Sequence, residues 1–169
     1  MQKKHIEKLF SGKLDDRVYF AFDDIRDKDL IIRKLDLLHE TVEVKMKCIR
    51  LYVLCGFDRA GKWGNGFWYL DIRDTLERVK ILMRFGCYPY IMRYEKCWTS
   101  PYYGMYTVIS RWCNQPAQFK KKSLREFCNL QGGSSKRYLD EFEKEYPQIS
   151  GYLDMKYDEV VADGALYRG

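Results

Sequence analysis

Three short apolar runs, separated by segments with helical spacing, constrain the fold of this chain more than any other feature. The runs are residues 18–22, 49–56 and 88–94. The first two runs are typical of strands buried on both faces of a parallel sheet, and the third has an early proline that fits the start of a strand. The segments between them place apolar side chains three and four residues apart, as one face of a helix requires, and the helix before the third run is expected to start at about Asp71. The alternation predicts a parallel α/β fold with right-handed crossovers.

After residue 95 the pattern indicates helices alone. Capping residues, glycines and prolines predict three helices there, over about residues 100–113, 123–130 and 134–146. The rest of the tail is expected to be weakly ordered. We therefore divide the chain into a β/α region over 1–98 and a helical extension with an acidic tail over 99–169, packed together as a single domain.

Composition narrows the class of protein without naming a function. With 46% hydrophobic and 32% charged residues, the chain is typical of a soluble globular protein, and it has no uninterrupted apolar stretch long enough for a membrane span. Its polar start lacks the apolar region of a signal peptide, so we expect a cytoplasmic protein. Six scattered cysteines without a C-x-x-C pair indicate reduced thiols.

Charge is distributed unevenly along the chain. Residues 84–137 carry 10 basic and 2 acidic side chains, whereas residues 138–169 carry 3 basic and 8 acidic ones. Such a basic block can steer an anionic partner to one face of the protein. Alternatively, the acidic tail folds back and neutralises the block, and the sequence leaves both interpretations open.

The basic block also contains most of the aromatic side chains that could contact a partner. Lys and Arg neutralise phosphates and aromatic rings stack on bases, although rings at helical spacing are more often packing residues. A loop over residues 59–68 adds two tryptophans that could carry recognition. The candidate residues for binding a partner or a nucleic acid, RNA included, are Lys120, Lys121, Lys122, Arg125, Arg93, Arg111, Trp63 and Trp68.

Carboxylates follow the first two predicted strands. Asp23, Asp24 and Asp58 could bind a metal or act as acid and base at the strand ends. Helix capping and solvation explain such residues as well, and no histidine or second cluster completes a site. We therefore expect no catalytic residue, no metal and no cofactor.

Several blocks together resemble the C-terminal half of radical S-adenosylmethionine proteins. They are VYFAFD (18–23), LYVLCGFD (51–58), YPYIMRY (88–94) and RWCNQP (111–116), and the resemblance is strongest to a bacterial and phage-associated group. It covers roughly residues 5–130 and implies a partial β/α barrel of about three strands. The family's C-x-x-x-C-x-x-C loop, which holds a [4Fe-4S] cluster, is missing here. No catalytic role is therefore carried over.

Three hypotheses about function follow. The first is a non-catalytic binding protein that engages a nucleic acid or nucleoprotein in the bacterial host cytoplasm, such as a phage-type inhibitor of a CRISPR effector. The second is one half of a split radical enzyme whose cluster-bearing half is a separate chain. The third is a metal-dependent or hydrolytic enzyme that uses the three aspartates.

The resemblance also implies a barrel that lacks its first half. A sheet cut in this way exposes unpaired backbone groups and apolar surface, which proteins rarely leave bare. We expect this surface to be closed by the chain's own terminal helices or by another chain, a second copy included.

Overall fold

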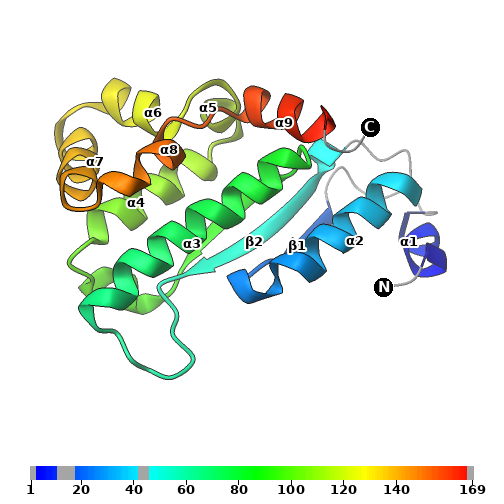
Figure 1. The fold of residues 1–169 in the computed structure, drawn as a ribbon, viewed down its shortest axis with the longest axis horizontal. Coiled ribbons are helices and arrows are strands. Elements are labelled where there is room, and N and C mark those ends of the chain that lie inside the picture. Colours follow the sequence, from blue (N-terminus) through cyan, green and yellow to red (C-terminus); the bar gives the residue numbers. More distant parts are fainter. Residues whose placement is uncertain (1–2, 11–17, 42–45, 167–169) are drawn as a thin grey trace.

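The computed structural model describes residues 3–10, 18–41 and 46–166, which form an α/β fold (Figure 1). One parallel sheet has the strand order β1 (Val18–Ala21), β2 (Ile49–Cys55) and β3 (Tyr88–Arg93). Helix α2 (Lys28–Thr41) connects β1 to β2, and α3 (Asn65–Arg84) connects β2 to β3. The predicted fold class is confirmed: a three-stranded parallel sheet with flanking helices is followed by a helical region.

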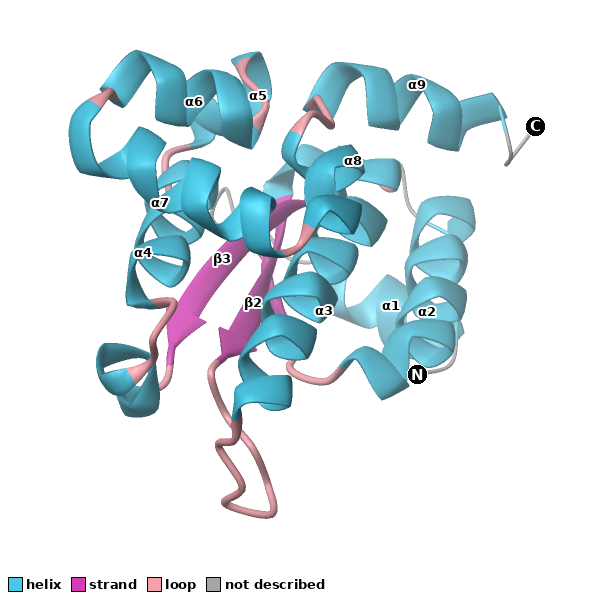
Figure 2. Ribbon diagram, turned by 60° about the vertical axis from the view of Figure 1, so that its left-hand side comes forward, coloured by secondary structure: helices cyan, strands magenta, loops and turns pink. Residues whose placement is uncertain are grey.

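Helices cover one face of the sheet, which we call the covered face. Alternate residues of β2, from Ile49 to Cys55, lie on this face and are at most 1% exposed. Helix α3 packs on β2, and α4 (Tyr103–Cys113) packs on β3 (Figure 2). Phe20 and Leu51 of the strands line one pocket together with residues of α2, while α1 (Lys3–Phe10) packs on α2. These contacts place the main core on the covered face.

The opposite face, which we call the open face, reaches solvent. The prediction of strands buried on both faces is wrong for β1, in which alternate residues are exposed, and for β2, in which alternate residues are only half-buried. Within the described residues, the helices that follow the strands lie on the covered face. The open face consists of Tyr19 and Ala21 of β1, Arg50, Tyr52 and Leu54 of β2, and Tyr88, Tyr90 and Met92 of β3.

Helix α3 begins at Asn65, six residues before the predicted start at Asp71. The buried side chains of Trp68 and Ile72 continue the helical spacing toward the N-terminus, and Gly64 takes the N-cap position. The loop predicted over residues 59–68 is correspondingly shorter. Asp71 lies inside α3, and its carboxylate accepts hydrogen bonds from other elements.

The helical region begins with a 3-10 helix (Glu95–Thr99) that the sequence did not predict. Ser100 accepts a hydrogen bond from the Tyr102 N–H, and α4 starts only at Tyr103. The predicted break at Gly132 and Gly133 is present, and both have positive φ. The helices after α4 are α5 (Pro116–Lys121), which was not predicted, α6 (Leu124–Gln131), which starts with a Ser123 capping box, and α7 (Gly133–Glu145).

The prediction of a weakly ordered tail is wrong. Residues 150–166 form α8 (Ser150–Leu153) and α9 (Tyr157–Leu166), and α9 packs on α3. Tyr157 is buried, and its hydroxyl donates to the Gly86 carbonyl at 2.6 Å. Burial of the Met155 and Val160 side chains also stabilises the packing of the tail. The acidic composition of the tail gave no indication of this apolar contact. None of the described helices combines the length and apolarity that a membrane crossing requires.

Candidate functional site

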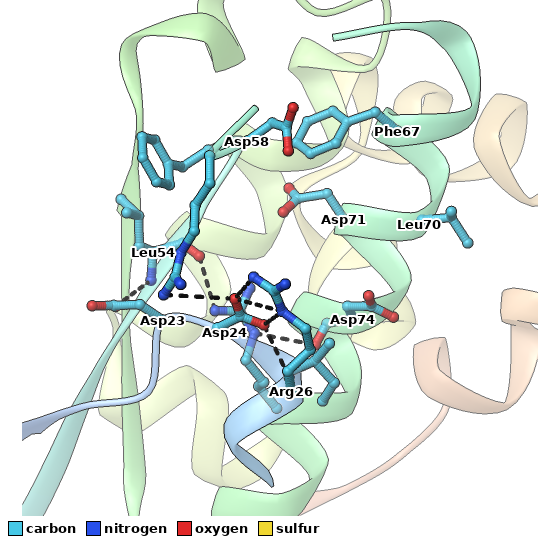
Figure 3. A pocket seen from close by; sticks show the side chains of 13 residues that line it. Asp23, Asp24, Arg26, Leu54, Asp58, Phe67, Leu70, Asp71 and Asp74 are labelled. Atoms are coloured by element: carbon cyan, nitrogen blue, oxygen red, sulfur yellow. Dashed lines mark hydrogen bonds and ion pairs between the residues drawn. The ribbon is translucent and has the colours of Figure 1, made fainter. Parts of the chain in front are cut away.

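A cavity of about 410 Å³ lies at the carboxyl ends of β1 and β2, where parallel α/β folds usually bind ligands (Figure 3). It brings together the three carboxylates expected from the sequence, Asp23, Asp24 and Asp58. Helix α3 adds Asp71 and Asp74 to its wall. The three carboxylates that follow the first two strands therefore line one shared cavity.

Arg78 closes the inner end of the cavity from α3. Its side chain is 2% exposed, and its Nη1 donates to the carbonyls of Phe22 and Leu54 at 2.9 Å each. Its Nη2 donates to the Thr75 hydroxyl at 3.0 Å. Burial lowers the pKa of this guanidinium, and the charge of Asp71 opposes that change. Arg78 thus satisfies the Phe22 carbonyl just after β1 and the Leu54 carbonyl near the end of β2.

Asp71 connects three elements. Its Oδ2 accepts hydrogen bonds from the Gly56 N–H and from the Tyr106 hydroxyl, both at 2.7 Å. Burial raises the pKa of Asp71 above its usual value, and the two hydrogen bonds oppose that change. Burial also raises the pKa of Tyr106, so its hydroxyl remains a donor. The pair holds the turn after β2, where Gly56 has a φ of +74°, against α3 and α4.

The other carboxylates also bind the backbone. Asp23 accepts the Leu54 N–H at 3.1 Å, and Asp58 accepts the Lys62 N–H at 2.6 Å. Asp24 caps the 3-10 turn Ile25–Asp27, and the hydrogen bond from the Arg26 guanidinium lowers the pKa of Asp24 to about 2. Across the part of the chain that is described, no three His, Cys, Asp or Glu side chains are placed to hold a metal ion. These contacts favour a structural role for the aspartates.

The open face carries the largest aromatic surface of the sheet. Tyr52 lies between two other tyrosines: its ring is stacked with Tyr19 at 5.3 Å and meets Tyr90 edge-on at 5.7 Å. Tyr19 is 42% exposed, Tyr90 39% and the neighbouring Met92 45%. A parallel sheet is normally covered on both faces, so a face of this kind is typical of an interaction surface.

The predicted lysines lie near one end of this face. Lys120 and Lys121 are exposed on α5, Lys122 is half-buried directly after it, and none of the three forms an ion pair with any described residue. The preceding residue, Phe119, contacts the ring of Tyr88, which is an open-face residue of β3. Helix α5 therefore lies against Tyr88, the first residue of β3 and the register partner of Arg50, where Tyr157 of α9 also stacks on the Tyr88 ring.

Arg111 and Arg125 differ in how strongly other side chains of the protein bind their guanidinium groups. Arg111 is exposed on α4 and donates to the Gln131 side chain at 3.0 Å. Arg125 donates to Glu143 at 2.6 and 2.7 Å and to Asp154 at 2.6 Å. Part of the acidic tail thus folds back and neutralises part of the basic block, as the second interpretation of the charge pattern expected.

The Arg125 contacts predict a pH-dependent stability. Hydrogen bonds from Arg125 lower the pKa of Glu143 below its usual value of 4.5. A carboxylate whose pKa is lower in the folded state stabilises the fold above its unfolded pKa, and this contribution is lost as the pH falls through the folded pKa. We expect Arg125→Leu to lower the free energy of unfolding by about 1–2 kcal/mol near pH 7 and by much less near pH 3.

Urea unfolding at both pH values measures this difference. Arg111→Leu is the matched control, because Arg111 binds a neutral amide and should show no such pH dependence. An Arg125→Leu effect that is the same at both pH values would contradict the assignment.

The remaining candidates lie apart from the lysines. Arg93 donates to Thr107 at 2.9 Å and lies 4.5 Å from the Trp98 ring centre. Trp63 donates to the Gly56 carbonyl at 3.2 Å, with the Lys96 ammonium 5.3 Å from the centre of its ring. Trp68 is 5% exposed and belongs to the core, so its ring does not face solvent. Arg93 and Trp63 therefore lie where the strands end, whereas α5 borders the opposite end of β3.

The open-face positions of Tyr19, Tyr52 and Arg50 were not predicted from the sequence. In β2 a period of two was present, because Arg50 and Tyr52 alternate with Ile49, Leu51 and Val53. The apolar character of Leu54 and Cys55 concealed it. Comparison of the chain with protein-family models, with curated proteins and with solved structures gives no match.

Proposed function

We propose that this protein is a non-catalytic binding protein that engages a nucleic acid or a nucleoprotein through the open face of its sheet. The observation that carries the proposal is the uncovered face itself, with Tyr19, Tyr52 and Tyr90 in ring contact. Soluble proteins rarely expose contiguous apolar surface without a partner for it. The hydrogen bonds of the cavity aspartates to the backbone favour binding over catalysis.

Charge favours an anionic partner. Arg50 lies on the open face, and Lys120 and Lys121 lie on the helix that borders it. The whole chain has a net charge of +6. Phosphate groups are the anionic partner most often recognised by such clusters, and they make binding depend on salt. The resemblance to a phage-associated group supports an inhibitor of a host defence nuclease as the biological setting.

Binding to a labelled RNA, measured by fluorescence polarisation, tests this proposal. We expect the affinity to fall at least about tenfold between about 50 and 200 mM salt, because bound phosphates release counterions. Lys120→Glu with Lys121→Glu should weaken binding at low salt by a similar factor. We omit Arg125 from this variant because its ion pairs support the fold.

Lys144→Glu is the control, since this lysine is exposed on α7, away from α5. Equal affinity of the lysine pair variant and the control would remove α5 from the interface. The absence of any salt-dependent binding to RNA or single-stranded DNA would contradict a nucleic-acid partner altogether.

A second candidate is one half of a split radical enzyme. The observation that favours it is the position of β1, an edge strand whose described residues pair only with β2, beside a face that further strands of a barrel would cover. A separate cluster-bearing chain would then complete the barrel.

Anaerobic reconstitution with iron and sulfide tests whether this chain holds a cluster by itself, which neither candidate expects. We expect the purified protein alone to stay colourless and to bind no S-adenosylmethionine, because no cysteine triad is spaced to ligate a cluster. A brown protein with stoichiometric iron would contradict a non-catalytic role.

A further inference from the structure

We infer that the open face binds a single-stranded nucleic acid, whose unpaired bases stack on Tyr19 and Tyr90. This inference rests on the proposed function and adds to it the form of the nucleic acid and the residues that recognise it. Single strands expose the faces of their bases, whereas a duplex hides them in its stack. An aromatic sheet surface can therefore select the single strand without reading its sequence.

The two faces of the sheet differ in the type of side chain that they carry. The covered face of β2 carries Ile49, Leu51 and Val53, which are typical of packing against helices. At the alternate positions the open face has Arg50, Tyr52 and Leu54, and the neighbouring strands add three tyrosines besides Ala21 and Met92. Tyrosine rings beside a guanidinium suit a polar, aromatic ligand whose bases can stack on them.

The rings form a short series across the strands. Tyr52 and Tyr90 are register partners on adjacent strands, and Tyr19 lies one diagonal position away from Tyr52. Tyr19 and Tyr52 are nearly parallel, with 20° between their planes, whereas Tyr90 meets Tyr52 at 88°. Tyr52 is thus enclosed by its neighbours, and the outer rings at 42% and 39% exposure offer the accessible surface. Both outer rings are large enough to stack with a base.

Arg50 supplies the charge that a stacked strand requires. Its guanidinium lies 6.0 Å from the Tyr88 ring centre, and its Nε–H is buried without a hydrogen-bond partner. Among the described residues no carboxylate pairs with it. A buried N–H without an acceptor is unfavourable, and an uncompensated guanidinium beside aromatic rings attracts phosphate. The face therefore combines stacking surface with a cation that no carboxylate of the described residues neutralises.

The position of α5 extends this cation site. Phe119 contacts Tyr88, and Lys120 and Lys121 follow in the same helix as exposed residues. A strand that stacks on Tyr90 can continue past Arg50 toward these lysines, so its phosphates meet a series of positive charges. The stacking rings then hold the bases, and the lysines add affinity that depends on salt.

Competition between matched oligonucleotides tests the inference. A labelled single-stranded oligouridine of about ten nucleotides is bound in polarisation experiments, and an RNA hairpin of similar length serves as the duplex competitor. We expect the single strand to bind at least about tenfold more tightly than the hairpin stem. Tyr90→Ala and Tyr19→Ala should each weaken binding by about tenfold, because one stacked base is worth that much or more.

Conservative and distant variants separate recognition from folding. Tyr90→Phe keeps the ring and should retain the affinity. Trp98→Ala removes an exposed ring that contacts Arg93 and Tyr103 outside the open face, and it should leave the affinity unchanged. Arg50→Gln should reduce the slope of log affinity against log salt by about one. Thermal unfolding of each variant confirms that the fold is intact.

Different failures have different meanings. If hairpin and single strand bind equally, the inference is overturned and the proposed function stands. If the tyrosine variants bind normally while Lys120→Glu with Lys121→Glu does not, the inference is overturned, and nucleic-acid binding stands without the open face as its site. If no nucleic acid binds and the protein is a dimer in solution that Tyr90→Arg dissociates, both are overturned, and the open face is an interface between copies.

Discussion

Replacement of Arg78 by methionine is expected to lower the free energy of unfolding by about 3–5 kcal/mol. Methionine has a similar reach and no donor, so the Phe22 and Leu54 carbonyls would lose their partner in a site where Arg78 is 2% exposed. Each unsatisfied buried group costs about 1–3 kcal/mol. Since small domains are stable by only about 5–15 kcal/mol, this loss is large.

Urea unfolding followed by far-UV circular dichroism measures the effect, and two further variants make it specific. Arg59→Met changes an arginine of the same cavity whose side chain is 70% exposed and whose nearest ion-pair partner is 3.8 Å away. It should stay within about 0.5 kcal/mol of the natural protein.

Arg78→Lys keeps the positive charge but replaces the planar guanidinium group, which has several N–H donors, by a single ammonium group. It should lie between the natural protein and Arg78→Met, because one nitrogen cannot reach both carbonyls and the Thr75 hydroxyl in the same geometry. A methionine variant as stable as the natural protein would show that water donates to the Phe22 and Leu54 carbonyls in place of Arg78. The fold around the cavity would then not depend on Arg78.

The order of strands and helices could be predicted because it depends on local spacing. Each strand-length run spans fewer than about 20 residues, and so does the apolar periodicity that predicts α2 or α3. The predicted starts of two helices were displaced. Helix α3 begins six residues before Asp71, whose side chain binds Gly56 and Tyr106, and α4 begins three residues after Ser100, which accepts the Tyr102 N–H.

The candidate site was only partly predictable for a related reason. Convergence of Asp23, Asp24 and Asp58 follows from parallel strands, whose carboxyl ends share one edge. Exposure of the open face depends instead on which other elements of the fold cover it. The sequence of β2, with its Leu, Tyr and Arg residues, does not indicate whether its second face is covered. Arg125 shows the same limit, because its partners lie 18 and 29 residues further along the chain.

Replacement of Gly164 by alanine is expected to separate α9 from α3 and to lower the free energy of unfolding by about 1–3 kcal/mol. A Cβ atom at this position would lie 2.3 Å from the Arg84 carbonyl oxygen and 3.0 Å from its carbonyl carbon. Backbone atoms cannot turn aside as a side chain can, so α9 itself would have to move. Helix propensity predicts the opposite sign, since alanine favours a helix over glycine by up to about 1 kcal/mol.

Gly151→Ala provides the matched comparison within the same tail. Gly151 lies in α8, and nothing is within 4 Å of the position its Cβ would occupy, so only the propensity effect should remain and the protein should be unchanged or slightly more stable. Hydrogen exchange would then show faster exchange over α9 in Gly164→Ala alone. If both variants gain stability, α9 does not depend on its close contact with Arg84, and the tail would be held by the Tyr157 hydroxyl and the buried Met155 and Val160 side chains instead.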